Sequence, residues 1–510
     1  MAAAAICYNY RVVLEAYFMS ETLHKPEKWN FFEPVVVPAP KSARWRLDAC
    51  VRMDDRTPIS LRCQDPSAAE WLSRHFKSAF GLRCVIDAAQ TENSLPPAGY
   101  RLAAAPETGI AIEASALAGV RYAFSTLRQI AFPARGGLTT SGFIMPAFEV
   151  EDSPSLPFRG MHYCWFPEHS PQTIERQIRL AAYYKFNYVV LENWGVWRSE
   201  TRPWFGWPDG KMTSAEVRRL CVLADDLGIT LVPQFNVVGH ASLSRVRTGN
   251  HATLDFAPEY EPLFEPYSGW NWCLSNEVAR ETIKTLCLEL HDLFGRPSYF
   301  HIGCDEACPP TCPDCRAADY NALFSSLVRE LADLFEARGA SILMWHDMLL
   351  AKGDSRWNGF YANGDANADA LLDALPRSAV ICDWFYGPAR VDGRYPTLDH
   401  FSAKGFRVLT CPADELGGIA AQGAYAADHG LFGLLDTTWT GFNGRTIPAV
   451  APAAANAAWS GKPYAGTVLA QDMTSPVNWH WRQIGWDMKV SEVRDTGFFN
   501  EQYPATTVTR

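Results

Sequence analysis

Between Phe158 and Trp439, eight short apolar runs alternate with helical stretches, and this pattern predicts an α/β fold in which a (β/α)8 TIM barrel follows a small α/β domain. Eight strand–helix units are the number that closes such a barrel, and the segment has the length of one. An open, doubly wound sheet is the main alternative. That fold usually has a glycine-rich phosphate loop after its first strand, and the sequence has none at this place.

Residues 1–150 show a different pattern and are expected to form the small α/β domain. Apolar residues recur at three- and four-residue spacing in Trp71–Phe80 and Ala116–Ile130, which predicts two helices. Short strands are expected at Cys84–Asp87, Tyr100–Ala104 and Gly109–Glu113. A turn-rich segment, residues 151–157, marks the junction with the barrel.

The barrel is expected to span residues 151–461, with a C-terminal extension, residues 462–510, that packs on it. Its eight strands are predicted at Phe158–Trp165, Asn187–Trp194, Ile229–Val238, Tyr299–Glu306, Ile342–Met348, Val380–Tyr386, Phe406–Cys411 and Leu431–Trp439. Helices between them are predicted at Pro171–Tyr184, Ser214–Leu227, Asn276–Leu293 and Asn321–Ala337.

Polar and aromatic residues gather at the C-terminal ends of most of these runs. They are Glu192, Trp194, His240, Asp305, Glu306, Trp345, His346, Asp347, Asp383, Trp384, Tyr386, Asp436 and Trp439. In a barrel, all C-terminal strand ends lie on one face, which is where the active sites of barrel enzymes lie. A purely structural sheet would not need this clustering, so the sequence predicts one shared site.

The composition excludes several kinds of partner. The net charge is -10 and no run of Lys or Arg occurs, so a nucleic-acid partner is not expected. No apolar run is long enough for a membrane helix, and the N-terminus lacks a signal-peptide pattern. Together with scattered cysteines, these features predict a cytoplasmic protein without a membrane partner. The 18 Trp residues suit stacking on sugar rings, and core filling is the alternative.

Asp305 and Glu306 are adjacent carboxylates at the end of an apolar run. Neighbouring side chains of a strand point to opposite faces, so this pair can serve one substrate only if the chain turns there. The following residues, Ala307–Pro310, suit such a turn. Two close carboxylates raise at least one pKa, which would make a general acid available near neutrality. An Asp–Glu dipeptide is also common on protein surfaces, but its place at the end of this run favours catalysis.

The segment His301-Ile302-Gly303-Cys304-Asp305-Glu306 resembles the His-x-Gly-Gly-Asp-Glu signature of family 20 glycoside hydrolases, the β-N-acetylhexosaminidases, with Cys304 where glycine is usual. Phe158–Gly160, Lys185–Asn187 and Gly239–Ala241 are similar to further motifs of that family, in the family's order. The resemblance implies an exo-acting glycosidase that needs no cofactor. Its partner would be a glycan with a terminal β-linked N-acetylhexosamine.

The resemblance also implies a substrate-assisted, retaining mechanism, in which the 2-acetamido group of the sugar is the nucleophile and an oxazolinium-type intermediate forms. Glu306 would protonate the leaving oxygen and then act as base on water. Asp305 would accept the acetamido N–H and stabilise the positive charge that develops on the amide.

Other site residues follow from the same resemblance. Arg159 would bind adjacent sugar hydroxyls, with a structural ion pair as the alternative, and His240 would lie near the acid. Trp345, Trp384 and Trp439 would form aromatic walls around the sugar.

Several positions depart from the family pattern. Strand 2 ends in Leu191-Glu192-Asn193-Trp194, Gln234 and Asn236 stand where acidic residues are common, and Gly441 stands where a Glu is usual. These changes resemble the hexosaminidase D-like branch of the family. Glu192 becomes the expected hydroxyl ligand, Tyr386 is expected to replace a tyrosine missing after strand 7, and Asp347 completes the expected substrate-binding set.

Cys308, Cys312 and Cys315 lie close together in sequence, and Cys312-Pro313-Asp314-Cys315 has the spacing of a zinc knuckle. Reduced thiols or a local disulfide are the alternatives, and the site is predicted to hold no metal.

Two other functions stay open: a non-catalytic carbohydrate-binding barrel and a conventional two-carboxylate β-glycosidase. A homodimer is compatible with the sequence.

Overall fold

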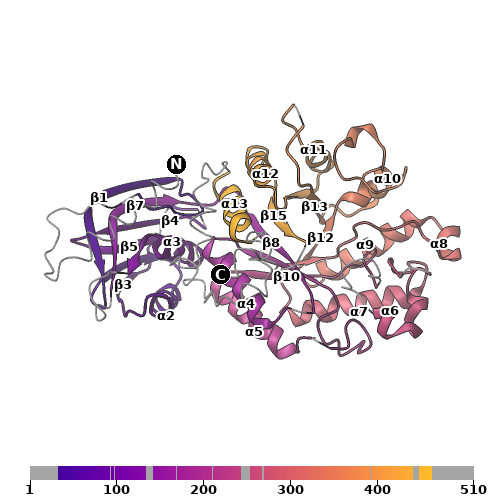
Figure 1. Cartoon of the computed structure of the whole chain (residues 1–510), viewed down its shortest axis with the longest axis horizontal. Coiled ribbons are helices and arrows are strands. Elements are labelled where there is room, and N and C mark those ends of the chain that lie inside the picture. The colour runs from indigo at the N-terminus through magenta and orange to yellow at the C-terminus, as the bar shows by residue number, and fades with distance from the viewer. Residues whose placement is uncertain are drawn as a thin grey trace, which may run out of the picture. The chain divides into compact units, whose positions relative to one another are not determined.

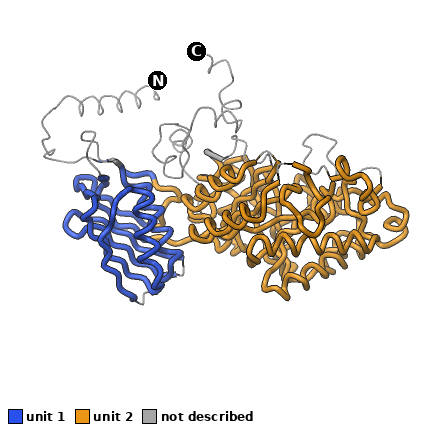
Figure 2. The backbone as a smooth tube through the Cα atoms, turned by 90° about the horizontal axis from the view of Figure 1, so that it is seen from below, with its two compact units in different colours: residues 1–35, 42–151 blue, residues 36–41, 152–510 orange. Residues whose placement is uncertain are grey.

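The computed structural model describes residues 31, 33–91, 94–96, 98–133, 142–167, 169–209, 211–242, 253–266, 269–390, 392–439 and 447–461. The chain divides into two compact units, which are Met1–Val35 with Ser42–Glu151, and Val36–Lys41 with Asp152–Arg510 (Figure 2). The expected extension, residues 462–510, and Gly441 lie outside the described residues.

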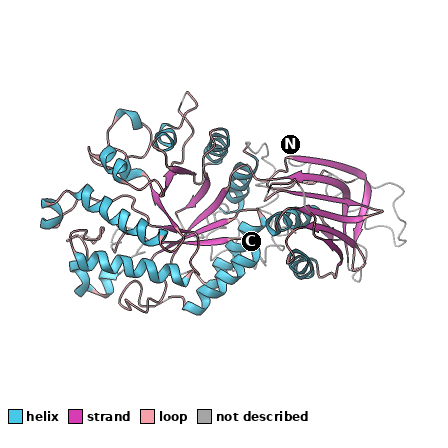
Figure 3. Ribbon diagram, turned by 180° about the vertical axis from the view of Figure 1, so that it is seen from behind, coloured by secondary structure: helices cyan, strands magenta, loops and turns pink. Residues whose placement is uncertain are grey.

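The first unit is a seven-stranded sheet in the order β1-β7-β4-β5-β2-β3, with β6 paired to β7. Its elements are β1 (Ser42–Met53), β2 (Pro58–Cys63), α2 (Ala68–Phe80), β3 (Val85–Ala89), β4 (Tyr100–Ala105), β5 (Gly109–Ala114), α3 (Leu117–Ile130), β6 (Phe132–Pro133) and β7 (Phe143–Asp152). Both helices lie on one face of the sheet (Figure 3). The two helices and three strands expected here are confirmed, whereas β1, β2 and β7 were not predicted.

Aromatic side chains join the two helices of this unit. Phe76 and Phe80 of α2 contact Phe124 of α3, with ring centroids 6.4 and 5.9 Å apart. Leu72 and Leu127 are fully buried beside them, as their helical spacing predicts.

The second unit is a closed barrel of eight parallel strands, in the order β10-β11-β12-β13-β14-β15-β8-β9 (Figure 1). The strands are β8 (Phe158–Trp165), β9 (Tyr188–Asn193), β10 (Thr230–Gln234), β11 (Tyr299–His301), β12 (Ser341–Trp345), β13 (Val380–Trp384), β14 (Arg407–Cys411) and β15 (Gly433–Thr438). Seven strands lie within their predicted apolar runs, and β12 begins one residue before its run, so the predicted barrel is confirmed.

Helices follow each barrel strand and surround the sheet (Figure 1). They are α4 (Pro171–Tyr183), α5 (Ser214–Leu227), α6 (Thr253–Phe256), η1 (Pro258–Leu263), α7 (Glu277–Leu293), α8 (Pro313–Ala317), α9 (Tyr320–Glu336), η2 (Asp347–Leu349), η3 (Ser355–Trp357), α10 (Ala368–Ala374), α11 (Pro396–Ala403), α12 (Leu416–Asp428) and α13 (Ile447–Ser460). Thr213 and Glu216 form a capping box that fixes the start of α5. No helix among the described residues is long and apolar enough to cross a membrane.

The interior of the barrel is filled in layers, with aromatic residues at the N-terminal end of the strands. Phe158 and Tyr188 stack there with ring centroids 4.1 Å apart, and Tyr299 packs edge-on against both. Val190 and Leu343 are buried in the next layer. Because this end is packed, a substrate can reach the interior only from the C-terminal strand ends.

Candidate active site

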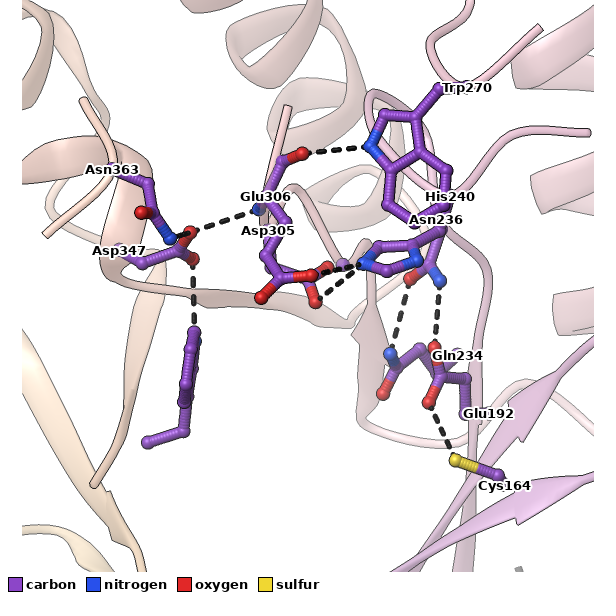
Figure 4. A network of polar contacts seen from close by, with 12 residues as sticks. Cys164, Glu192, Gln234, Asn236, His240, Trp270, Asp305, Glu306, Asp347 and Asn363 are labelled. Atoms are coloured by element: carbon purple, nitrogen blue, oxygen red, sulfur yellow. Dashed lines mark hydrogen bonds and ion pairs between the residues drawn. The ribbon is translucent and has the colours of Figure 1, made fainter. Parts of the chain in front are cut away.

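The chain turns sharply after β11 ends at His301. Gly303, Cys304 and Glu306 have φ values of 67°, 80° and 48°, in the left-handed region that non-glycine residues rarely adopt. A Cβ on Gly303 would lie 2.0 Å from the side-chain oxygen of Asn236, so only glycine fits there. The expected turn at the carboxylate pair is present, and it brings Asp305 and Glu306 to one side (Figure 4).

His240 bridges the two carboxylates from the loop after β10. Its Nε2 atom lies 3.3 Å from Asp305 Oδ2 and 3.5 Å from Glu306 Oε2 (Figure 4). The preceding Gly239 packs against the backbone of Asp305, where a Cβ would approach the carbonyl oxygen to 2.3 Å. The Gly–His turn and the Asp–Glu turn therefore fit against each other, and the expected position of His240 beside Glu306 is confirmed.

The two carboxylates have different surroundings. The side chain of Asp305 is 8% exposed and that of Glu306 is 48% exposed. Asp305 Oδ1 is buried and has no hydrogen-bond partner among the described residues. A buried acceptor without a donor is unfavourable and is typical of a site that a ligand completes.

The pKa shifts of the two carboxylates are opposite to those expected for Glu306 as the acid, because the pKa of Asp305 is raised and that of Glu306 is lowered. Burial raises the pKa of Asp305 to about 6, although the charge of His240 opposes the rise. The hydrogen bond from His240 lowers the pKa of Glu306 despite partial burial. Burial acts to lower the pKa of His240, but the charge of Asp305 and the bonds to both carboxylates raise it well above its usual value. The predicted raised pKa thus belongs to Asp305, and burial rather than repulsion between the pair causes it.

Asp347 and Trp270 hold the backbone of Glu306. Asp347 Oδ2 accepts from the Glu306 N–H at 2.9 Å and from Asn363 at 2.9 Å, and its Oδ1 accepts from Trp384 Nε1 at 3.3 Å. On the other side, Trp270 Nε1 donates to the Glu306 carbonyl oxygen at 2.8 Å (Figure 4). Asp347, expected as a substrate ligand, is fully buried, so we correct its role to positioning Glu306 and Trp384.

Glu192 lies under the carboxylate pair in a buried polar network. Its Oε1 accepts from Asn236 at 2.7 Å, and its Oε2 lies 3.1 Å from His162 Nε2 and 3.2 Å from Cys164 Sγ. Burial acts to raise the pKa of Glu192, but the contacts with His162 and Asn236 lower it to about 2. Protein groups occupy both oxygens, so the expected hydroxyl ligand acts instead as a support for this network.

His162, Cys164 and Glu192 could in principle hold a metal ion, because one ligand atom from each lies within 4.8 Å of the others. However, the His162 ring and the Cys164 thiol already bond to the Glu192 carboxylate. We therefore assign no metal to this group.

Aromatic rings line the opposite part of the barrel mouth. The ring centroids of Trp345 and Trp439 lie 5.2 Å apart. The ring centroid of Trp384 lies 6.4 Å from that of Trp439 and 5.7 Å from that of Tyr386. The structure thus brings the four predicted aromatic residues together. Trp345 is fully buried, and its indole N–H has no partner among the described residues. Tyr361, which was not predicted, stacks on Trp384 at 4.3 Å.

Arg159 lies at the start of β8, at the far end of the barrel from the carboxylates. Its side chain is buried and donates to the backbone carbonyl oxygens of Lys185 and Leu156 at 3.1 and 2.9 Å. The strand that separates it from the mouth is about 20 Å long. The prediction that Arg159 binds sugar hydroxyls is therefore wrong, because this arginine joins loops at the closed end.

Two of the three cysteines in the predicted cluster come together, and the third does not. Cys312 and Cys315 lie beside Cys273, with all three sulfur atoms within 4.8 Å of one another. Cys308 is exposed and is not a member of this group. The sequence could not indicate Cys273, because it reaches the cluster from a different loop.

Several other residues of the site were not predicted as such. His162 and Cys164 lie inside an apolar run, and their alternation with Phe158 and Gly160 would have shown that they share the inner face of the strand. Trp270 and Asn363 come from long loops, for which the sequence contains no register signal.

A pair of carboxylates at the mouth of a (β/α)8 barrel is an arrangement that glycoside hydrolases use. Residues 33–153 match "Glycosyl hydrolase family 20, domain 2", and residues 169–386 match "Glycosyl hydrolase family 20, catalytic domain". The two matches cover well over half of the chain, which therefore belongs to glycoside hydrolase family 20.

Curated proteins that are similar in sequence carry hexosaminidase names. A β-hexosaminidase of Porphyromonas gingivalis (strain ATCC BAA-308 / W83) is 22% identical over 450 residues, which are 74% of this chain and 55% of the relative. A β-N-acetylhexosaminidase of Cellulomonas fimi is 30% identical over 197 residues, 34% of this chain and 36% of the relative. The aligned part of the chain thus spans about a third to a half of the length of these curated relatives.

Solved structures share the fold. The GH20 exo β-N-acetylglucosaminidase from Vibrio harveyi, in complex with N-acetylglucosamine, has a TM-score of 0.66 at 17% identity and covers 93% of this chain and 80% of its own. The β-N-acetylhexosaminidase from Bacteroides fragilis NCTC 9343 has a TM-score of 0.66 at 20% identity and covers 88% and 96%.

Proposed function

We propose that this protein is a retaining exo-β-N-acetylhexosaminidase that removes terminal β-linked GlcNAc or GalNAc from glycans by substrate-assisted catalysis. The observation that supports it most is the unequal carboxylate pair, in which the buried Asp305 keeps one oxygen without a partner among the described residues and Glu306 faces solvent. A relative of the same fold, the β-hexosaminidase of Streptomyces plicatus, has been solved with GlcNAc as its product.

In this proposal Asp305 binds the amide of the substrate. Its Oδ1 atom accepts the acetamido N–H, while Oδ2 remains paired with His240. The carboxylate then orients the amide oxygen toward the anomeric carbon and stabilises the positive charge that develops as the ring closes to an oxazolinium ion. Because the pKa of Asp305 is about 6, the side chain is largely ionised above that pH.

Glu306 handles the proton of the leaving group. In the open site, His240 lowers the pKa of Glu306. A bound glycan would cover this half-exposed carboxyl and remove water from it, and burial favours the protonated form of a carboxyl group. The Asp347 and Trp270 contacts hold its backbone in place, so the same carboxyl can give the proton and later take one from water.

The aromatic residues would form the apolar wall of the sugar site. Trp384 and Tyr361 present stacked rings, and Trp345 and Trp439 continue the wall into the barrel. Flat apolar rings suit the faces of a pyranose and the methyl group of an acetamide.

Hydrolysis of three aryl β-glycosides tests the proposal. We expect turnover of the GlcNAc and GalNAc glycosides, release of the β-anomer first, and inhibition by a thiazoline analogue of the intermediate. Comparable turnover of a plain β-glucoside would contradict it and favour a two-carboxylate β-glycosidase. Sugar binding without hydrolysis of any of the three would favour a non-catalytic barrel.

A further inference from the structure

A compact group of thiols joins two loops beside the active site. Cys273 lies on the loop before α7, whereas Cys312 and Cys315 lie at the start of α8, and the three sulfur atoms are within 4.8 Å of one another. The Cys273 and Cys315 sulfur atoms are 3.7 Å apart. Two thiolates on one tetrahedral zinc ion, with Zn–S bonds of about 2.3 Å, lie about 3.8 Å apart.

A hydroxyl oxygen lies close to all three sulfur atoms. Ser275 Oγ lies 3.4 Å from Cys273 Sγ, 3.1 Å from Cys315 Sγ and 3.8 Å from Cys312 Sγ. A sulfur and an oxygen ligand of one zinc ion are about 3.6 Å apart. The backbone N–H of Ser275 also donates to Cys315 Sγ at 3.4 Å, an outer contact of the kind that orients metal ligands.

A buried carboxylate beside the thiols lacks a full set of partners. Glu265 is 3% exposed, and its Oε2 accepts from the backbone N–H groups of Thr311 and Cys312 at 2.7 and 2.6 Å. Its Oε1 has no hydrogen-bond partner among the described residues, although the same carboxylate contacts the Cys315 thiol. A buried carboxylate oxygen without a donor, beside the Cys315 thiol, is unfavourable, and a cation next to it would offset that cost.

From this geometry we propose that Cys273, Cys312 and Cys315 bind a structural zinc ion, with Ser275 Oγ at the fourth vertex and Glu265 beside the ion. Soft thiolates in a tetrahedral set that includes an oxygen fit Zn²⁺ better than Mg²⁺ or Ca²⁺, which take oxygen ligands. Binding releases the thiol protons to solvent. Cys308, which the sequence grouped with Cys312 and Cys315, is not a ligand.

The ion would stabilise the loops that hold the catalytic acid. Trp270, three residues before Cys273, donates to the Glu306 carbonyl, and the Asn271 side chain donates to and accepts from the backbone of Cys308. The same two loops are also in contact through Cys273 on one side and Cys312 and Cys315 on the other. A zinc ion there would fix their separation next to Glu306 without touching the substrate.

Metal analysis of the full chain, purified without chelator or dialysed against zinc, tests the proposal. We expect about one tightly bound zinc per chain, its loss in Cys312→Ser, and its retention in the matched control Cys308→Ser, which changes an exposed thiol outside the group. Binding of less than about a tenth of an equivalent after zinc dialysis would overturn the proposal. Equal zinc in both variants would also overturn it.

Cobalt substitution of the wild-type chain keeps the test decisive if Cys312→Ser does not fold. We expect thiolate-to-cobalt charge-transfer bands and the intense visible bands of a tetrahedral ion. An octahedral spectrum without charge-transfer bands would contradict thiolate binding. Loss of two of the 14 thiols in a titration of the unreduced, unfolded chain would instead show a disulfide and overturn the zinc site. None of these readouts depends on hydrolase activity.

Discussion

The two halves of the barrel mouth are built from the same kind of strand but present different chemistry. Strands β8 to β11 place His162, Glu192, Gln234 and His301 toward the interior, next to the carboxylate pair. Strands β12 to β15 place Trp345 and Trp384 there, followed by Tyr386 and Trp439. The first half is a hydrogen-bonded polar network, and the second half is a wall of rings.

In the proposed function, this difference separates the residues that handle the proton from those that bind the sugar. A buried network fixes the positions and the pKa values of Asp305, Glu306 and His240, whereas aromatic rings offer apolar surface with few polar groups. Asp347 joins the halves, because one oxygen accepts from the Glu306 backbone and the other from Trp384. Changes in the polar half should therefore alter catalytic rate and pH dependence, and changes in the aromatic half should alter binding.

The largest effect is expected for Glu306→Gln. With a poor leaving group, loss of the general acid should lower kcat by roughly 10² to 10⁴-fold, because the departing oxygen must leave without a proton. With an activated aryl leaving group the loss of kcat in the first step should be much smaller. Steady-state and single-turnover rates for both substrates check this. The same loss with both substrates would argue that Glu306 is not the acid.

Tyr361→Ala should affect binding more than rate. Tyr361 is 39% exposed and stacks on Trp384, so its removal takes away part of the aromatic wall. We expect KM to rise about threefold to tenfold with kcat nearly unchanged. Tyr361→Phe is the matched control and should keep the wild-type KM. A fall in kcat without a change in KM would show that Tyr361 acts in the chemical step rather than in substrate binding.

His240→Gln should shift the pH profile. In the wild type, kcat/KM should fall below about pH 6, as Asp305 becomes protonated. The charge of His240 opposes the rise in the Asp305 pKa, so removal of the imidazolium should raise that pKa further and move the acidic limb to higher pH. A kcat/KM profile across the acidic and neutral range measures the limb. A limb that stays in place or moves to lower pH would contradict this electrostatic role.

Arg159→Gln should have the smallest effect on substrate binding. Arg159 bonds to backbone carbonyl oxygens at the closed end of the barrel, so KM should stay within about twofold of the wild type. The free energy of unfolding should fall by roughly 1–3 kcal/mol, because buried carbonyl groups lose a charged donor. Kinetics and denaturant unfolding check both values, and a tenfold rise in KM would restore the sugar-binding role.

The sequence predicted the barrel because its parallel strands are covered on both faces and read as continuous apolar runs. Strand β1 was missed because its exposed positions alternate with partly buried ones and contain charged residues, which gives a weak signal. Site residues that lie a few residues after the end of a strand, such as His240 and Glu306, could be found from position alone. Arg159 is the second residue of β8, so its position would have placed it at the opposite end of the barrel.

The remaining contacts could not be predicted, because they join loops that are distant in sequence. Trp270 and Cys273 meet residues after β11 only once the two loops fold against each other. The pKa order of Asp305 and Glu306 also depends on burial, and adjacent positions in a sequence do not show which side chain is covered.

In the proposed mechanism, the acetamide of the substrate is the nucleophile, and Asp305 orients it and stabilises its developing charge. The most direct test compares kcat/KM for aryl β-glucosaminides whose N-acyl group carries zero to three fluorine atoms. Fluorine withdraws electrons from the amide oxygen, so kcat/KM should fall steeply with each substitution, and Asp305→Asn should weaken that dependence. A flat series in the wild-type enzyme would contradict substrate assistance and require a nucleophile from the protein.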